Sequence, residues 1–205
     1  WFIGVDMPTA SRQRSLRAMA LEAVEAKIHF LPEWSRNRLR GMLESRPDWC
    51  ISRQRSWGLP IPAFRMPDGR IFMTAASVRA VALRVASMGS DAWCAETPEQ
   101  LLAAYDAWRD REAPQGLDLS KHEKLHDIFD VWFESGVAWF TVMESRGLGN
   151  PSDLYLEGSD QHRGWFQASL LPALATTGEP PYRTLLTHGF IVDRNGRKMS
   201  KSEGN

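Results

Sequence analysis

The chain has 205 residues, of which 43% are hydrophobic, and this length and composition predict a globular protein with one large or two small folded units. Its 25 basic and 25 acidic side chains give a formal net charge of zero, so the composition does not indicate a basic nucleic-acid-binding domain. An RNA partner would have to be bound by local positively charged patches. Apolar runs fall well short of the roughly 18 residues that span a bilayer, so no membrane partner is expected.

Two amphipathic helices are predicted first. Residues 11–24 place apolar side chains on one face and arginines on the other, at a spacing typical of a helix. Ser35 is predicted to cap a short second helix, which Pro47 ends. Residues 49–51 are apolar and predict a short strand.

The middle of the chain predicts an insertion without a chemical motif. Residues 61–73 are typical of an edge hairpin, because they contain prolines and an Asp-Gly turn. Two helices are predicted next, over residues 77–87 and 98–109, and the second begins with a Thr-Pro-Glu-Gln capping sequence. Residues 65–120 are therefore expected to pack or to position other parts, not to catalyse.

The C-terminal part predicts a strand, a helix and a second strand. Residues 153–157 form the first strand, Ser159 or Asp160 caps a helix that runs toward Thr177, and residues 183–188 form the second strand. Such a unit indicates a parallel sheet with a right-handed crossover. Ligands bind at the carboxyl ends of parallel strands, so the residues that follow each strand are the candidates for a site.

A hairpin with two lysines closes the chain. Residues 190–192 predict a short buried strand, and Asn195-Gly196 favours the positive φ angles of a tight turn. Lys198 and Lys201 follow in a loop of small polar residues, which is expected to be mobile. Two ammonium groups on such a loop can close over a polyphosphate, although a solvated basic tip is the commoner outcome for a Lys-x-x-Lys pair.

Four blocks of sequence resemble one family. Residues 198–202, Lys-Met-Ser-Lys-Ser, match the KMSKS signature of class I aminoacyl-tRNA synthetases. Residues 153–166, DLYLEGSDQHRGWF, resemble the active-site segment of the isoleucyl-tRNA synthetases in that class. Residues 46–60 resemble the segment by which the branched-chain group returns from its editing insertion, and residues 130–136, DVWFESG, are the fourth block. The blocks occur in the family's order and span most of the chain.

The resemblance implies a fold and a division of the chain. The fold class is α/β, the second half of a Rossmann-like nucleotide-binding parallel sheet with an inserted helical and hairpin region. Residues 1–64 would return from the editing insertion, residues 65–120 would form a connective insertion, and residues 121–205 would form the C-terminal half of the catalytic domain. The chain starts at Trp1 and contains no His-Ile-Gly-His-type element, so we interpret it as an internal fragment that cannot activate an amino acid alone.

The resemblance also implies an adenylate site after the first C-terminal strand. Gly158 would let a ribose approach the backbone, and Asp160 would accept hydrogen bonds from its hydroxyl groups, with Glu157 as a second acceptor. Gln161 would contact the amino acid or its activated carbonyl. An Asp at a helix start is most often only a cap, and Asp160 can do both.

Further positions match the family around that site. Trp132 and Trp165 would form the aromatic walls of the isoleucine pocket, although a single Trp is more often part of a core. His188 and Gly189 would lie against the nucleotide, and the ATP-binding loop would include Met199, whose backbone would lie near adenine.

The lysine loop would complete that site. Ser200 belongs to the same ATP-binding stretch by its place in the signature. Lys198 and Lys201 would stabilise the pyrophosphate that leaves when the isoleucine carboxylate attacks ATP.

The implied reaction sets the expected cofactors and partners. The parent protein would use ATP with Mg²⁺, L-isoleucine and tRNA(Ile), and it is expected to be a monomer. No metal is expected on this segment, and Cys50 and Cys94 are too few and too far apart for a metal knuckle or a disulfide scaffold. Both are expected to be reduced and partly buried in a cytoplasmic protein. The alternative is a non-catalytic nucleotide- or RNA-binding paralogue that keeps half of the site.

Overall fold

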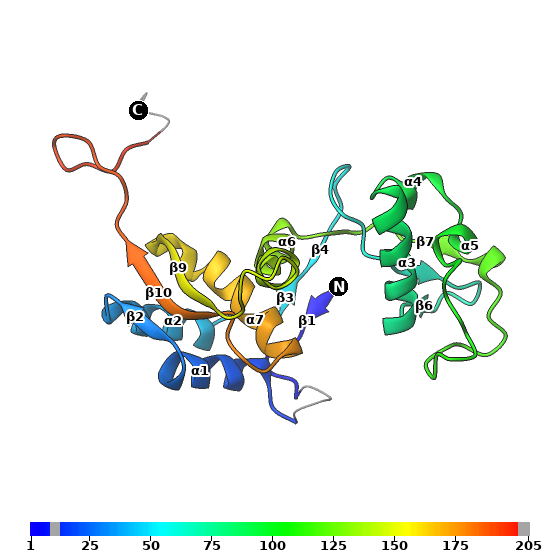
Figure 1. Cartoon of the computed structure of the whole chain (residues 1–205), viewed down its shortest axis with the longest axis horizontal. Coiled ribbons are helices and arrows are strands. Elements are labelled where there is room, and N and C mark those ends of the chain that lie inside the picture. The colour runs from blue at the N-terminus through cyan, green and yellow to red at the C-terminus, as the bar shows by residue number, and fades with distance from the viewer. Residues whose placement is uncertain (9–12, 201–205) are drawn as a thin grey trace. The chain divides into compact units, whose positions relative to one another are not determined.

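The computed structural model describes residues 1–8 and 13–200, which fold as two compact units. Unit 1 contains Trp1–Ile51 together with the chain from Asp130 onward, and unit 2 contains Ser52–Phe129. The two units are coloured by position along the chain in Figure 1. The division of the chain into three parts with different roles stays a prediction.

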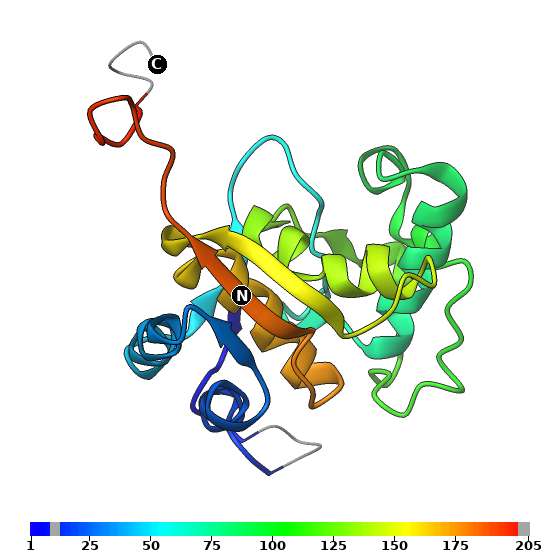
Figure 2. The same cartoon turned by 60° about the vertical axis from the view of Figure 1, so that its left-hand side comes forward.

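Unit 1 is built on a parallel sheet of three strands. These are β2 (His29–Leu31), β9 (Ser152–Gly158) and β10 (Tyr182–His188), and β10 pairs in parallel with both of the others. Figure 2 shows the orange β10 between the blue β2 and the yellow β9. The predicted strand, helix and parallel strand are thus confirmed.

The described part of unit 1 also contains four α-helices. They are α1 (Leu16–Ala26), α2 (Trp34–Glu44), α6 (Val131–Gly136) and α7 (Trp165–Thr176). A π-helical turn covers Trp139–Glu144, and the short strands β1 (Phe2–Ile3) and β3 (Trp49–Cys50) pair antiparallel. The nine residues from Phe166 to Leu174 in α7 are all buried, so it is the central helix of the core.

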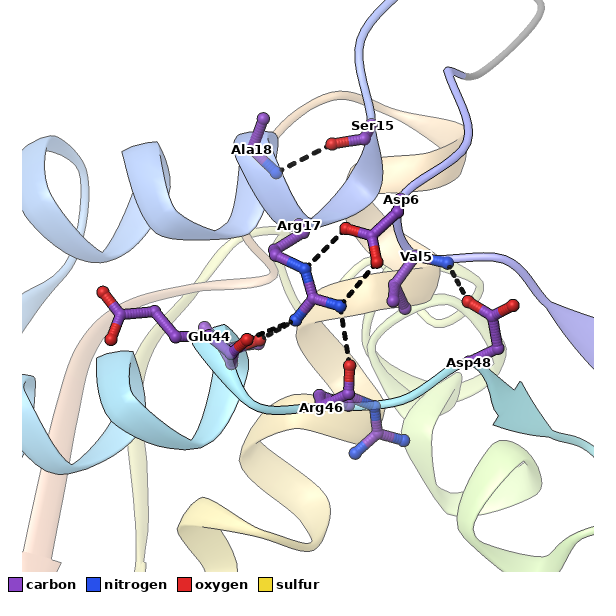
Figure 3. Close-up of polar contacts among 9 residues, drawn as sticks. Val5, Asp6, Ser15, Arg17, Ala18, Glu44, Arg46 and Asp48 are labelled. Carbon is purple, nitrogen blue, oxygen red and sulfur yellow. Dashed lines mark hydrogen bonds and ion pairs between the residues drawn. The ribbon is translucent and has the colours of Figure 1, made fainter.

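An arginine ties the first helix to the end of the second. Arg17 of α1 makes two hydrogen bonds to the carboxylate of Asp6, at 2.6 and 2.8 Å. Its guanidinium also donates to the backbone carbonyls of Leu43, Glu44 and Arg46, which lie at and beyond the C-terminal end of α2 (Figure 3). Carbonyls at a helix end lack the regular helical partner, and the planar guanidinium gives each of these three a side-chain donor. The Leu43 carbonyl also accepts the Arg46 backbone N–H at 3.3 Å.

Unit 2 has its own sheet and its own core. The strands β5 (Phe64–Arg65), β6 (Ile71–Phe72) and β7 (Glu123–Lys124) form an antiparallel sheet, and β4 (Ser52–Arg53) pairs with β8 (Ile128–Phe129). The helices are α3 (Ala75–Met88), α4 (Ala92–Ala95) and α5 (Pro98–Leu101), followed by a 3-10 turn over Leu119–Lys121. The predicted hairpin is confirmed, with Gly69 at a positive φ of 86° in its turn. Its predicted place at a sheet edge is wrong for β5, which is the central strand and pairs with both β6 and β7.

Several predicted boundaries in the first half are wrong. The first helix starts at Leu16 with Ser15 as its cap, and the predicted start near residue 11 falls outside the described residues. Ser35 does not cap the second helix, which begins one residue earlier, and it is fully buried. The predicted helix over residues 98–109 ends at Leu101, although its capping sequence is formed as predicted.

Two burial predictions are also wrong. Residues 190–192 form no buried strand, since Phe190, Ile191 and Val192 are all exposed. Cys94 is exposed as well, whereas Cys50 is partly buried as expected, and both are free thiols. None of the helices within the described ranges is long and apolar enough to cross a membrane.

Candidate adenylate site

Four of the predicted nucleotide residues, Glu157, Gly158, His188 and Gly189, lie at the carboxyl ends of two neighbouring strands. In the register of β9 and β10, Gly158 lies opposite His188 and Glu157 lies opposite Thr187. Gly189 follows directly at the end of β10. Because both strands are parallel, their C-terminal residues lie at the same edge of the sheet, where open α/β sheets bind ligands.

Gly158 is buried where the chain turns sharply out of β9. A Cβ atom added there would lie 2.8 Å from Oδ1 of Asp160 and 3.8 Å from ring atoms of both His188 and Phe190. Any side chain would therefore press on the carboxylate that the turn presents. The absence of a side chain keeps the Asp160 carboxylate close to the backbone, as a site for a closely held ligand requires.

Side-chain hydrogen bonds organise the turn after β9, and neither predicted residue caps the helix that follows. Ser159–His162 forms a 3-10 turn, and α7 starts only at Trp165, so the prediction that Ser159 or Asp160 caps the long helix is wrong. The Gln161 side chain takes that role, because its Oε1 accepts the Trp165 backbone N–H at 3.0 Å. Its Nε2 donates to the Asp160 carboxylate at 3.0 Å. Gln161 therefore fixes the exposed Asp160 to the start of α7.

The two predicted pocket tryptophans lie next to this turn, Trp132 against Gly164 and Trp165 at the start of α7. Trp132 of α6 is 45% exposed, and two of its ring carbons lie 2.9 and 3.0 Å from the point where a Gly164 Cβ would sit. Oε1 of Gln161 lies 2.5 Å from that same point. Gly164 thus allows an exposed indole and the Gln161 amide to approach each other. Asp130 fixes the start of α6, since its carboxylate accepts from the Trp132 backbone N–H at 3.3 Å and from the Trp49 indole at 3.1 Å.

Trp165 stands on a stack of aromatic rings. Its indole stacks on Tyr155 at 4.2 Å between ring centroids and 10° between planes, and Tyr155 lies 4.6 Å from the buried ring of Tyr182. The indole N–H donates to the Ser135 carbonyl at 3.0 Å. Stacked rings and a satisfied N–H hold this indole in one orientation. Sequence patterns indicated Trp165 but not Tyr155, because ring stacking depends on contacts across α7 and β9.

The lysine hairpin is formed and stands beyond β10 (Figure 1). Val192 bridges Lys198, and the Met199 N–H donates to the Ile191 carbonyl at 3.0 Å. Gly196 has a φ of 76°, so the turn forms where it was predicted, but the predicted positive φ is wrong for Asn195. Ser200 ends the described stretch in a half-buried position. The predicted second lysine, Lys201, lies outside the described residues.

His162 is a site residue that sequence reasoning left unassigned. Its ring is fully buried, with Nδ1 2.9 Å from the Ser159 carbonyl and Nε2 3.4 Å from Oγ1 of Thr187. The ring therefore joins the turn after β9 to the last residues of β10. Burial is the main cause that lowers the pKa of His162 below its usual 6.5, and the neighbouring Arg38 lowers it further.

The lowered pKa makes the stability of the turn pH-dependent. We expect the free energy of unfolding to fall as the pH drops below about 6.5, because the unfolded chain then binds a proton that folded His162 resists. In His162→Gln this part of the pH dependence should disappear, and thermal unfolding between about pH 7 and pH 5 measures it. The exposed His29, changed to Gln, is the matched control and should leave the slope unchanged. Equal slopes in all three proteins would contradict the assignment.

The site offers hydrogen-bonding groups and positive charge. Among residues 1–8 and 13–200, no group of three His, Cys, Asp or Glu side chains has a geometry that could hold a metal ion. The groups that the described part of the site presents include the Asp160 carboxylate, the Gln161 amide, the exposed indole of Trp132 and the Lys198 ammonium. These groups suit the binding of a nucleoside and the neutralisation of a phosphate.

Comparison with known proteins identifies relatives along the whole chain. A family model described as tRNA synthetases class I (I, L, M and V) matches residues 1–205. Isoleucine–tRNA ligase of a Nitratiruptor species is 50% identical over 209 residues, which cover 100% of this chain and 22% of that protein. The corresponding ligase of Thioalkalivibrio sulfidiphilus is 47% identical over 208 residues, which cover 100% of this chain and 20% of that protein.

A solved ternary complex, the LeuRS of Agrobacterium radiobacter K84 with tRNA and LeuAMS, is 22% identical at a TM-score of 0.49, over 77% of this chain and 21% of that one. That likeness is low, so the family rests on the sequence matches. The chain spans about a fifth of the length of the curated relatives it matches. Because the family model covers every residue, this chain belongs to the class I tRNA synthetases of the I, L, M and V group.

Proposed function

We propose that the full-length protein containing this chain is an isoleucine–tRNA ligase. It would join L-isoleucine to ATP as isoleucyl-adenylate with release of pyrophosphate, and then transfer the amino acid to tRNA(Ile). The relatives named isoleucine–tRNA ligase are 46 to 50% identical over the whole chain. The observation that carries the proposal is the meeting of the Gly158 turn, the Gln161 amide and the exposed Trp132 ring at the end of the parallel sheet.

The nucleotide would lie across the ends of β9 and β10. The ribose hydroxyl groups would donate to the Asp160 carboxylate, with Glu157 as a second acceptor, and Gly158 would admit the sugar to the backbone. His188 and Gly189 would border the base. His188 supports this placement, because its Nδ1 lies 2.7 Å from the Gly189 carbonyl and its ring therefore stays close to the strand end.

The amino acid would lie between the two indoles. Trp165 is held rigidly by its stack, and Trp132 presents a partly exposed apolar face beside Gln161. Large rigid rings exclude water and limit the volume of a guest, as recognition of a branched aliphatic side chain requires. The Gln161 amide, which can both donate and accept, would contact the carboxyl group or the acylated phosphate.

The lysine loop would close over the phosphates of MgATP, which enters as a substrate. Lys198 and Lys201 would neutralise the charge that builds on the leaving pyrophosphate, and the backbone of Met199 and Ser200 would border the nucleotide. The role of this chain within the parent enzyme would be that of the second half of the nucleotide site. The chain alone would then be inactive, and the parent would act as a monomer.

The test is isoleucine-dependent exchange of radiolabelled pyrophosphate into ATP by the full-length protein. We expect exchange with isoleucine, weaker exchange with valine, and charging of tRNA(Ile) but not of a non-cognate tRNA. Leucine-dependent or methionine-dependent exchange would place the protein elsewhere in the group. Binding of ATP without any amino-acid-dependent exchange would instead favour the non-catalytic paralogue.

A further inference from the structure

An aromatic ring lies between the Gly158 turn and the lysine hairpin. Phe190 follows β10 by two residues and is 43% exposed, and a ring atom of Phe190 lies 3.8 Å from the point where a Gly158 Cβ would sit. One edge of the ring therefore faces the turn that presents Asp160. The next residue, Ile191, is 78% exposed, so it does not pack into a core as a buried strand residue would.

The hairpin returns Lys198 to the face of this ring. The bridge between Val192 and Lys198 places residue 198 diagonally across from residue 190, a spacing at which long side chains and aromatic rings meet. The Lys198 ammonium lies 3.6 Å from the centroid of the Phe190 ring. That distance is well within the range of a cation–π contact.

The hairpin's own carboxylate does not compete for this ammonium. Asp193 is the only acidic residue between positions 189 and 200. Its Oδ1 accepts the backbone N–H groups of Asn195 and Arg197, each at 2.8 Å, so Asp193 organises the turn. A neutral ring holds an ammonium more weakly than a carboxylate would, and an incoming polyphosphate can therefore displace it.

We propose that Phe190 is a positioning residue that holds the Lys198 ammonium beside the Gly158 turn, from which it transfers to the phosphates of the bound nucleotide. This role rests on the proposed function, because it acts through the leaving pyrophosphate. The ring confines a long flexible side chain near the place where charge develops and leaves the ammonium its full positive charge. The conformational entropy lost on phosphate binding is correspondingly smaller.

The test combines three variants of the full-length protein in pyrophosphate exchange. Phe190→Leu should lower kcat by about two- to fivefold, the rate equivalent of an exposed cation–π contact, with the KM for isoleucine unchanged. Phe190→Tyr keeps an aromatic ring and should retain the wild-type kcat. Ile191→Ala, a truncation of the exposed neighbour, is the matched control and should not change kcat.

A double-mutant cycle separates positioning from direct contact with the nucleotide. If Phe190 acts through Lys198, then Phe190→Leu should cause no further loss in a Lys198→Ala background. Independent, multiplying losses would overturn the role, as would an unchanged or faster Phe190→Leu enzyme. If the wild-type protein shows no isoleucine-dependent exchange, the proposed function itself is overturned. If the wild-type protein exchanges normally and the Phe190 substitution does not change the rate, only the role of Phe190 is overturned.

Discussion

Replacing Lys198 by alanine should reduce isoleucine-dependent pyrophosphate exchange by roughly 10²-fold or more. Removing one preorganised group that stabilises developing charge typically costs 10²- to 10³-fold in kcat, and an ammonium aimed at a leaving pyrophosphate belongs to that class. The loss should fall on kcat, with the KM for isoleucine little changed, because the charge it meets is larger in the transition state than in bound ATP.

A matched control comes from the exposed lysine of unit 2. Lys121 forms a surface ion pair with Asp118 at 2.9 Å and lies outside the proposed site, so Lys121→Ala should exchange at the wild-type rate. Steady-state exchange in the full-length protein measures both variants. Full activity in Lys198→Ala would remove the hairpin from the mechanism, and a rise in KM alone would show that Lys198 only helps to bind ATP.

A methyl group added at Gly136 should destabilise the fold that carries the tryptophan wall. Gly136 ends α6, and an added Cβ would lie 2.1 Å from the carbonyl oxygen and 2.7 Å from the carbonyl carbon of Ala168 in α7. Backbone atoms inside a buried helix cannot move aside as a flexible side chain can. Gly136→Ala should therefore cost about 3 kcal/mol, the upper part of the range for overpacking.

The expected result is a lower thermal unfolding midpoint together with weaker isoleucine activation, since Trp132 lies on the helix that must shift. Gly41→Ala provides the control with the same added methyl group. Gly41 lies inside α2 with no atom within 4 Å of the new Cβ, so the change should stabilise by about 0.5–1 kcal/mol through helix propensity. Similar thermal unfolding midpoints for both variants would show that α6 and α7 leave room for a methyl group at Gly136.

Local patterns predicted the parallel pair β9 and β10 of unit 1, but neither the third strand β2 nor the start of the main helix. The sequences of β9 and β10 are typical of strands, and one helix separates them. A strand, helix and strand in this order allow few sheet topologies. The turn between β9 and α7 was predicted from Ser159 and Asp160 as common caps, whereas a Gln161 side chain and Gly164 set the boundary. Rules for caps describe average helices, and a functional turn can satisfy the same backbone groups with other side chains.

The predicted length of α5 failed for a different reason. Leu101 and Leu102 are buried, but continuing the helix would carry the chain toward Trp108, which is 99% exposed. There the Asp106 side chain accepts the Trp108 N–H at 3.0 Å, an alternative to the helical hydrogen bond that a propensity sum does not count. His162 was missed because its burial depends on Thr187, which lies 25 positions away in the sequence.

Unit 2 leaves unit 1 and returns to it at neighbouring points of the backbone. The Asp130 N–H donates to the Ile51 carbonyl at 2.8 Å, so the excursion starts and ends across a single hydrogen bond. The entropy cost of closing a loop grows only with the logarithm of its length, by about 0.6 kcal/mol for each doubling, so a long excursion costs little more than a short one. The same junction could accept a shorter or an unrelated graft, and the Asp130 carboxylate would still hold Trp49 and Trp132 in register behind it.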